Sequence, residues 1–223
     1  MFGSGQMPIQ AGQAAPDFTV PSVHEDGTIS LADFRGKRPL LLGLFRGLYC
    51  PFCRRAVAQM AATSAHLKSL GVDSLAIVGT DVENARLYFK FRPTRMAIGA
   101  DPQLATHRSY GVPRPQPTPE LMQMMENVRI NPTGELPAPL PLAAAAAALA
   151  ALDGYQMTPT DERDAEATFT QLKGQFLVDR AGIVRWSHIE GAEGAASMGK
   201  FPSHEELVSA ASIVLGGAQV GSE

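Results

Sequence analysis

The only two cysteines of the chain stand three residues apart, as Cys50-Pro51-Phe52-Cys53, between an apolar run and a helical pattern. The run, residues 40–45, is typical of a strand that is buried on both faces of a sheet. A thiol in the first turn of a helix lies close to unpaired backbone N–H groups and to the positive end of the helix dipole. Both stabilise the thiolate, which is the nucleophile in sulfur redox chemistry. The motif therefore predicts a dithiol redox site at the junction of a buried strand and a helix.

Charge and hydropathy argue against two classes of partner. Of the 223 residues, 19 are Lys or Arg and 22 are Asp or Glu, and the cations are scattered, which argues against nucleic-acid binding. The longest apolar segment, roughly residues 140–152, is shorter than the ~20 residues that cross a bilayer. The start of the chain, MFGSGQMPIQAGQ, lacks the basic and apolar parts of a secretory signal. We therefore expect a cytoplasmic protein without nucleic-acid or membrane partners, where a cysteine pair is more often catalytic or metal-binding than structural.

The rest of the chain alternates between strand and helix patterns. Four further segments have the apolar pattern of strands: residues 75–78, 96–100, 175–179 and 183–186. Three segments have apolar residues at helical spacing: residues 52–70, 80–91 and 203–214. Thr80 with Glu83, and Ser203 with Glu206, predict capping boxes at the starts of the last two helices. This order predicts an α/β fold, with a central mixed sheet that has helices on both faces and ends in a hairpin.

Residues 113–170 interrupt the alternation. They contain nine of the 17 prolines, a cluster of three methionines and the alanine run 143–148. Prolines prevent regular structure where they cluster, but residues 121–128 keep helical spacing and residues 142–152 are strong helix formers. We expect one domain, residues 1–223, with a long Pro/Ala-rich insertion at 113–170 that acts as a lid or an interface or packs on its own domain. An exposed Ala/Leu helix favours packing against a second copy, which would give a homodimer.

Strand, Cys-x-x-Cys and helix in this order resemble the thioredoxin fold. More narrowly, the chain resembles the peroxiredoxin-like family of alkyl hydroperoxide reductase and thiol-specific antioxidant proteins (AhpC/TSA, redoxin), in its Cys-x-x-Cys subgroup. Six segments carry the resemblance: residues 15–18, 30–37, 45–53, 100–102, 110–112 and 173–179. It covers about residues 11–112 and 171–215, and it implies a thioredoxin-like central mixed β-sheet flanked by helices.

The chain departs from the family pattern around the cysteines. Typical members place a Pro and a Thr or Ser ahead of the peroxide-reacting Cys. If Cys50 is matched to that Cys, Gly43 and Gly47 stand in those places. If Cys53 is matched instead, Arg46 and Cys50 stand there. The second register resembles thioredoxin more closely.

The resemblance also implies roles for four residues. One cysteine attacks and the other closes on the intermediate, which is a mixed disulfide with a disulfide substrate and a sulfenic acid with a peroxide. We predict that Cys50, nearer the open end of the helix, attacks and that Cys53 resolves. Arg46 is available to bind substrate or stabilise the thiolate, as is Lys173. Lys173 stands where the family has an Arg and supplies charge without a planar fork.

The predicted activity is that of a cysteine-based antioxidant oxidoreductase that reduces peroxides or disulfides. Its redox-active disulfide is Cys50–Cys53, and we expect no other cofactor and no metal. Electrons would come from a thiol reductant such as thioredoxin, glutaredoxin or glutathione.

A different class of function is a non-catalytic redoxin-fold binding module whose cysteines are structural or zinc-bound. Cys-x-x-Cys is half of many zinc sites, and His66 lies at a finger-like spacing from Cys53, although no second His follows closely. Arg54 and Arg55 either help to stabilise the thiolate or form an exposed helix face.

Overall fold

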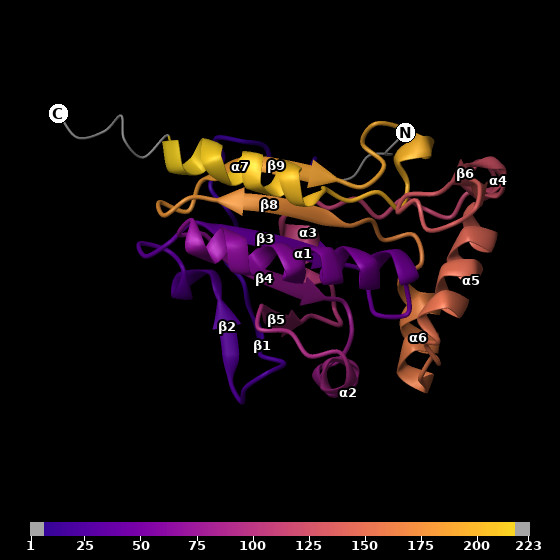
Figure 1. The fold of residues 1–223 in the computed structure, drawn as a ribbon, viewed down its shortest axis with the longest axis horizontal. Coiled ribbons are helices and arrows are strands. Elements are labelled where there is room, and N and C mark those ends of the chain that lie inside the picture. The colour runs from indigo at the N-terminus through magenta and orange to yellow at the C-terminus, as the bar shows by residue number, and fades with distance from the viewer. Residues whose placement is uncertain (1–6, 217–223) are drawn as a thin grey trace.

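A five-stranded sheet forms the centre of the protein, which we describe for residues 7–216 of a computed structural model. Residues 1–6, part of the segment examined for a secretory signal, and residues 217–223 lie outside the described residues. The strand order is β5-β4-β3-β8-β9 (Figure 1). The strands are β3 (Leu40–Phe45), β4 (Asp73–Val78), β5 (Ala97–Ala100), β8 (Gly174–Val178) and β9 (Val184–Ile189). β3, β4 and β5 run parallel and β8 and β9 antiparallel, which confirms the predicted mixed sheet.

The central strand β3 is buried along its whole length. It pairs with β4 on one side and β8 on the other, so both of its edges are hydrogen-bonded inside the sheet. Its apolar run therefore lies where side chains on both faces leave water. The loop that leads to Cys50 begins directly after Phe45, at the carboxyl end of this strand.

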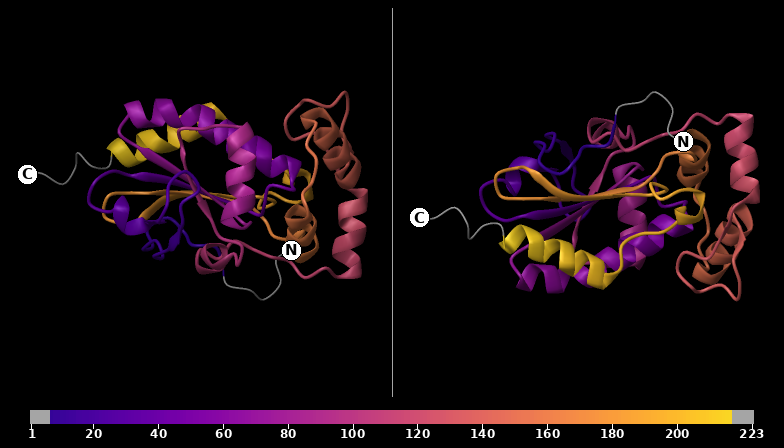
Figure 2. Two further views of the ribbon diagram at one scale, coloured as in Figure 1. Left: turned by 90° about the horizontal axis from the view of Figure 1, so that it is seen from below. Right: turned by 90° about the horizontal axis from the view of Figure 1, so that it is seen from above.

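Helices cover both faces of the sheet. The helices that flank it are α1 (Pro51–Ser69), α2 (Val82–Phe91), α3 (Ala105–Ser109) and α7 (His204–Gly216). α1 and α7 lie side by side on one face (Figure 2), where their apolar residues share a core with β3 and β4. The other face is covered by the hairpin of β1 (Thr19–Pro21) and β2 (Thr28–Ser30) and by the segment that follows α3. No helix in the described part of the chain is both long and apolar enough to cross a membrane.

The two predicted capping boxes have different outcomes. At α7, Ser203 N donates to Glu206 Oε2 over 2.7 Å and Glu206 N donates to Ser203 Oγ over 3.2 Å, which confirms the box. At α2 the prediction is wrong, because Asp81 is the cap and accepts a hydrogen bond from Asn84 N over 2.7 Å. Thr80 is buried, and its hydroxyl accepts from the side chain of Asn84 instead.

The two ends of the insertion, residues 113–170, lie side by side, since Leu172 N donates to Pro113 O over 3.0 Å. Between these ends lie α4 (Pro119–Asn127), β6 (Arg129–Ile130), β7 (Leu140–Pro141), α5 (Leu142–Asp153) and α6 (Pro159–Thr168). α4 and α5 confirm the two expected helices, whereas α6 was not expected. Figures 1 and 2 show these helices standing across the end of the sheet at which α1 begins. The segment thus packs on its own chain, and a homodimer stays a prediction.

Gly43 is a test of how tightly β3 is packed. An added Cβ would lie 2.6 Å from a ring carbon of Phe45 and 2.8 Å from Met60 Sδ. We expect Gly43→Ala to lower the free energy of unfolding by about 1–3 kcal/mol, because overpacking forces neighbours out of their positions. Urea denaturation measures this. Gly216→Ala, where an added Cβ meets no atom within 4 Å, is the control and should change stability little.

Candidate active site

The Cys-x-x-Cys motif forms the first turn of α1. Cys50 is the cap residue with an extended backbone, and Pro51 is the first helical residue. Cys53 N donates to Cys50 Sγ over 3.4 Å, so the sulfur of Cys50 takes one of the donors that a helix start leaves unpaired. Proline is favoured at this position because its missing N–H would have no helical partner. The local sequence therefore holds Cys50 at the mouth of the helix, as predicted.

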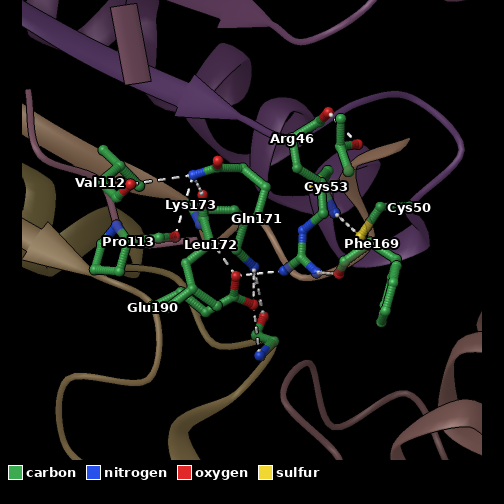
Figure 3. Close-up of polar contacts among 12 residues, drawn as sticks. Arg46, Cys50, Cys53, Val112, Pro113, Phe169, Gln171, Leu172, Lys173 and Glu190 are labelled. Atoms are coloured by element: carbon green, nitrogen blue, oxygen red, sulfur yellow. Dashed lines mark hydrogen bonds and ion pairs between the residues drawn. The ribbon is translucent and has the colours of Figure 1, made fainter. Parts of the chain in front are cut away.

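Both cysteines are free thiols below the protein surface, with 4% of Cys50 and 0% of Cys53 exposed. Burial in apolar surroundings alone would keep both thiols protonated. The surroundings are not only apolar, however, because Arg46 and Lys173 both interact electrostatically with each sulfur. Figure 3 shows Arg46 beside the two cysteines. The structure thus brings together the four residues singled out in the sequence.

A fifth residue, Glu190, completes the site and was not predicted. It follows β9, is 1% exposed and lies between Arg46 and Lys173 (Figure 3). Its Oε2 accepts hydrogen bonds from the guanidinium of Arg46 and from Lys173 N, the latter over 3.1 Å. Its Oε1 accepts from Lys173 Nζ over 3.1 Å and from Gly199 N over 2.8 Å. The predicted hairpin alone would place Ile189 opposite Lys173, and a β-bulge between Leu177 and Val178 shifts the register so that Glu190 lies there instead.

The charges of this network do not cancel. Burial raises the pKa of Glu190, but the neighbouring Arg46 and Lys173 outweigh it and hold the pKa at about 2. The carboxylate is therefore ionised at neutral pH. Two cations around one carboxylate leave a net positive charge next to the sulfurs, which favours a thiolate.

The pKa values of the two thiols are shifted in opposite directions, although Arg46 and Lys173 act to lower both. Burial raises the pKa of Cys50, but the hydrogen bond from Cys53 and the charges of Arg46 and Lys173 lower it to about 6. Burial raises the pKa of Cys53 well above its usual range, and the hydrogen bond and charge of Cys50 raise it further. At neutral pH this arrangement gives a Cys50 thiolate beside a Cys53 thiol. The attacking role of Cys50 stays a prediction that this arrangement supports.

Arg54 and Arg55 serve another purpose than expected. Arg54 is buried, so its interpretation as part of an exposed helix face is wrong. It forms an ion pair with Asp153 and donates to the backbone oxygens of Leu48 and Tyr49. Arg55 forms ion pairs with Asp153 and Glu135 and donates to two backbone carbonyls. Both arginines thus fix the insertion to the start of α1.

His66 does not lie with the cysteines. It lies in the last turns of α1, and its Nδ1 is 3.2 Å from Nε2 of His204 at the start of α7. Within residues 7–216, no group of three or more His, Cys, Asp or Glu side chains is placed to share a metal ion.

We expect alkylation of the reduced protein to distinguish the thiols. Labelling of Cys50 should increase with pH as the thiolate forms, with a midpoint near pH 6. Cys53 should stay unlabelled at pH 7. Arg46→Gln should shift the Cys50 midpoint upward, because one neighbouring positive charge is lost. Mass mapping after iodoacetamide treatment measures both. Equal labelling of the two cysteines at pH 7 would contradict the assignment.

Glu190→Gln tests the charge network. It leaves Arg46 and Lys173 buried without a counter-ion, so we expect the free energy of unfolding to fall by about 3–5 kcal/mol in urea denaturation. The midpoint for Cys50 should fall at the same time, because the carboxylate raises the pKa of that thiol. The exposed Glu193, three residues further on, provides the control as Glu193→Gln.

Comparisons with known proteins agree with this architecture. The crystal structure of AhpC from Enterococcus faecalis is 16% identical, with a TM-score of 0.61 and coverage of 96% of each chain. Peroxidoxin BcpB from Mycobacterium tuberculosis is 12% identical, with a TM-score of 0.57 and coverage of 95% of this chain and 98% of its own. These likenesses show a thioredoxin-like fold. No curated protein matches the sequence. The sequence model of the AhpC/TSA family, however, matches residues 11–187, most of the chain. The chain is therefore a member of the AhpC/TSA family.

Proposed function

We propose that this protein is a thiol oxidoreductase that reduces peroxides with Cys50 and Cys53. Family membership supports the thiol chemistry. The observation that carries the proposal is the charge around Cys50, whose pKa is lowered to about 6 although the residue is buried. A thiolate that persists at neutral pH beside a protonated thiol is the starting state that a peroxide-reducing pair requires.

In the first step, the Cys50 thiolate attacks one oxygen of the peroxide and the O–O bond breaks. Cys50 becomes a sulfenic acid, and the other oxygen leaves as an alcohol or water after it takes a proton. In the second step, the sulfur of Cys53 attacks the Cys50 sulfur, and the hydroxyl group leaves as water with the Cys53 proton. The peroxide has then gained two electrons and the cysteines have lost two, as a disulfide. Two equivalents of thiol reductant, such as glutathione or the dithiol of thioredoxin or glutaredoxin, restore the pair.

Arg46 is suited to stabilise the charge that develops on the leaving oxygen. Its Nε is buried and has no hydrogen-bond partner among the described residues, while its other nitrogens bind Glu190 and Phe169 O. An unpaired donor of this kind can bind a substrate oxygen. Two of the three donors of Lys173 Nζ are directed to Glu190 Oε1 and to Gly199 O, and we assign this residue an electrostatic role.

Thiol–disulfide exchange is the second candidate activity. It is favoured by the glycines at positions 43 and 47, where the family's Pro and hydroxyl residue are missing in the Cys50 register. A protein described as a thiol:disulfide interchange protein of the DsbE type, from Chlorobium tepidum, is 18% identical with a TM-score of 0.50, covering 91% of this chain and 99% of its own. This likeness extends to the fold alone.

Stopped-flow mixing of reduced protein with hydrogen peroxide separates the two activities. Peroxide reduction predicts a second-order rate constant about 100-fold or more above that of a free thiol, since the site stabilises the thiolate and the leaving oxygen. Cys50→Ser should abolish the reaction. Cys53→Ser should keep the first step and accumulate a sulfenic acid that dimedone traps. A wild-type rate equal to that of a free thiol would favour disulfide exchange instead.

A further inference from the structure

Part of the insertion packs against the start of α1, where the cysteine pair lies. We call residues 119–169 the cap. Ile130 and Leu149 of the cap belong to the same apolar core cluster as Cys50 and Cys53. The cap stands across the end of the sheet at which α1 begins (Figure 1). Access to either sulfur therefore depends on how firmly the cap is attached.

The first attachment is centred on Asp153, at the end of α5. Its Oδ2 accepts from Nε and Nη2 of Arg54 over 2.9 and 2.5 Å, and its Oδ1 lies 2.9 Å from Nη1 of Arg55. Arg54 Nη1 donates in turn to Leu48 O over 2.8 Å and to Tyr49 O over 3.0 Å. One carboxylate of the cap is thus connected, through a single guanidinium, to the backbone of the loop that carries Cys50.

The second attachment is at the far end of the cap. Tyr49, next to Cys50, places its hydroxyl 3.0 Å from Thr168 Oγ1. Arg46 Nη1 donates to Phe169 O over 3.2 Å. The cap therefore holds the loop 46–50 at two points, the end of α5 and the end of α6.

Lifting the cap is unfavourable because of Arg54. The guanidinium is buried, lies 4.3 Å from the ring centroid of Tyr155 in the cap, and has Asp153 as its counter-ion. Separation would break the two charge-assisted hydrogen bonds from Arg54 to Asp153 and the contact of the guanidinium with the Tyr155 ring. The closed form, in which only 4% of Cys50 is exposed, is accordingly the favoured one.

We propose that the closed cap restricts reduction of the Cys50–Cys53 disulfide to low-molecular-weight thiols, and that Asp153 is the residue that sets this selectivity. The inference rests on the proposed function, because it concerns the step that restores the thiols. A small thiolate attacks Cys50, forms a mixed disulfide and releases the Cys53 sulfur, which takes a proton. A second thiol attacks the outer sulfur of the mixed disulfide and releases Cys50, so two thiols become one disulfide and two electrons enter the protein. A protein dithiol must bring its own backbone to the same sulfur and would collide with the cap.

The test compares two reductants of one disulfide. The Cys50–Cys53 disulfide is formed with diamide, so the result does not depend on peroxide chemistry. Its reduction is then followed with dithiothreitol and with reduced thioredoxin at equal concentration. For the wild-type protein we expect dithiothreitol to be faster by at least tenfold. Faster reduction by thioredoxin would overturn the proposal. Failure of the peroxide reaction alone would overturn only the proposed function.

Variants of the cap identify the residue responsible. Asp153→Asn should raise the ratio of the thioredoxin rate to the dithiothreitol rate at least tenfold, and Asp153→Glu should restore the wild-type ratio. Glu126→Gln, which removes an exposed carboxylate elsewhere in the cap, is the matched control and should leave the ratio unchanged. An unchanged ratio in a folded Asp153→Asn protein would refute the role of Asp153. If that variant does not fold, Thr168→Val removes the second attachment and is measured by the same ratio. A raised ratio would support restriction by the cap, and an unchanged ratio would refute it.

Discussion

The carboxylate of Glu190, held between Arg46 and Lys173, is the interaction on which the chemistry of the site depends. Each of these groups would be costly in the interior alone, and together they are tolerated because the carboxylate pairs with both cations. The strand order supplies the geometry, since the three residues lie at the ends of neighbouring strands β3, β8 and β9. What remains is one unbalanced positive charge, and it is placed beside two sulfurs.

Much of the fold follows from local patterns, because local interactions decide it. Three features can be read from neighbouring residues alone: the apolar run of β3, the turn between β8 and β9, and the proline at the start of α1. α6 was missed because its sequence, PTDERDAEAT, is polar and shows no apolar spacing, although Thr158 and Asp161 form a capping box ahead of it. At α2, two candidate caps stand one residue apart. The burial of Thr80 against Asn84, a tertiary effect, decides between them.

The candidate site was predictable in part. Cys50 and Cys53 are adjacent in the chain and share one helix start, so their geometry is local. The electrostatics are not. Arg54 and Arg55 are the cations closest in sequence, yet carboxylates of the insertion occupy them, and the charge comes from Arg46 and the distant Lys173. Glu190 reads in isolation as a solvated carboxylate after a strand, and only its register against Lys173 shows that it points inward.

Burial of the sulfurs and stabilisation of a thiolate on one of them are linked. Cys50 is buried, and the loss of water by itself would raise the pKa of the thiol. The same loss of water strengthens the attraction between a thiolate and nearby cations, because the local dielectric falls. A covered cysteine pair therefore needs a buried cationic network, whereas an exposed pair could rely on the helix start alone. Loop 46–50 meets both requirements, since it presents Arg46 to Glu190 on one side and Tyr49 to the cap on the other.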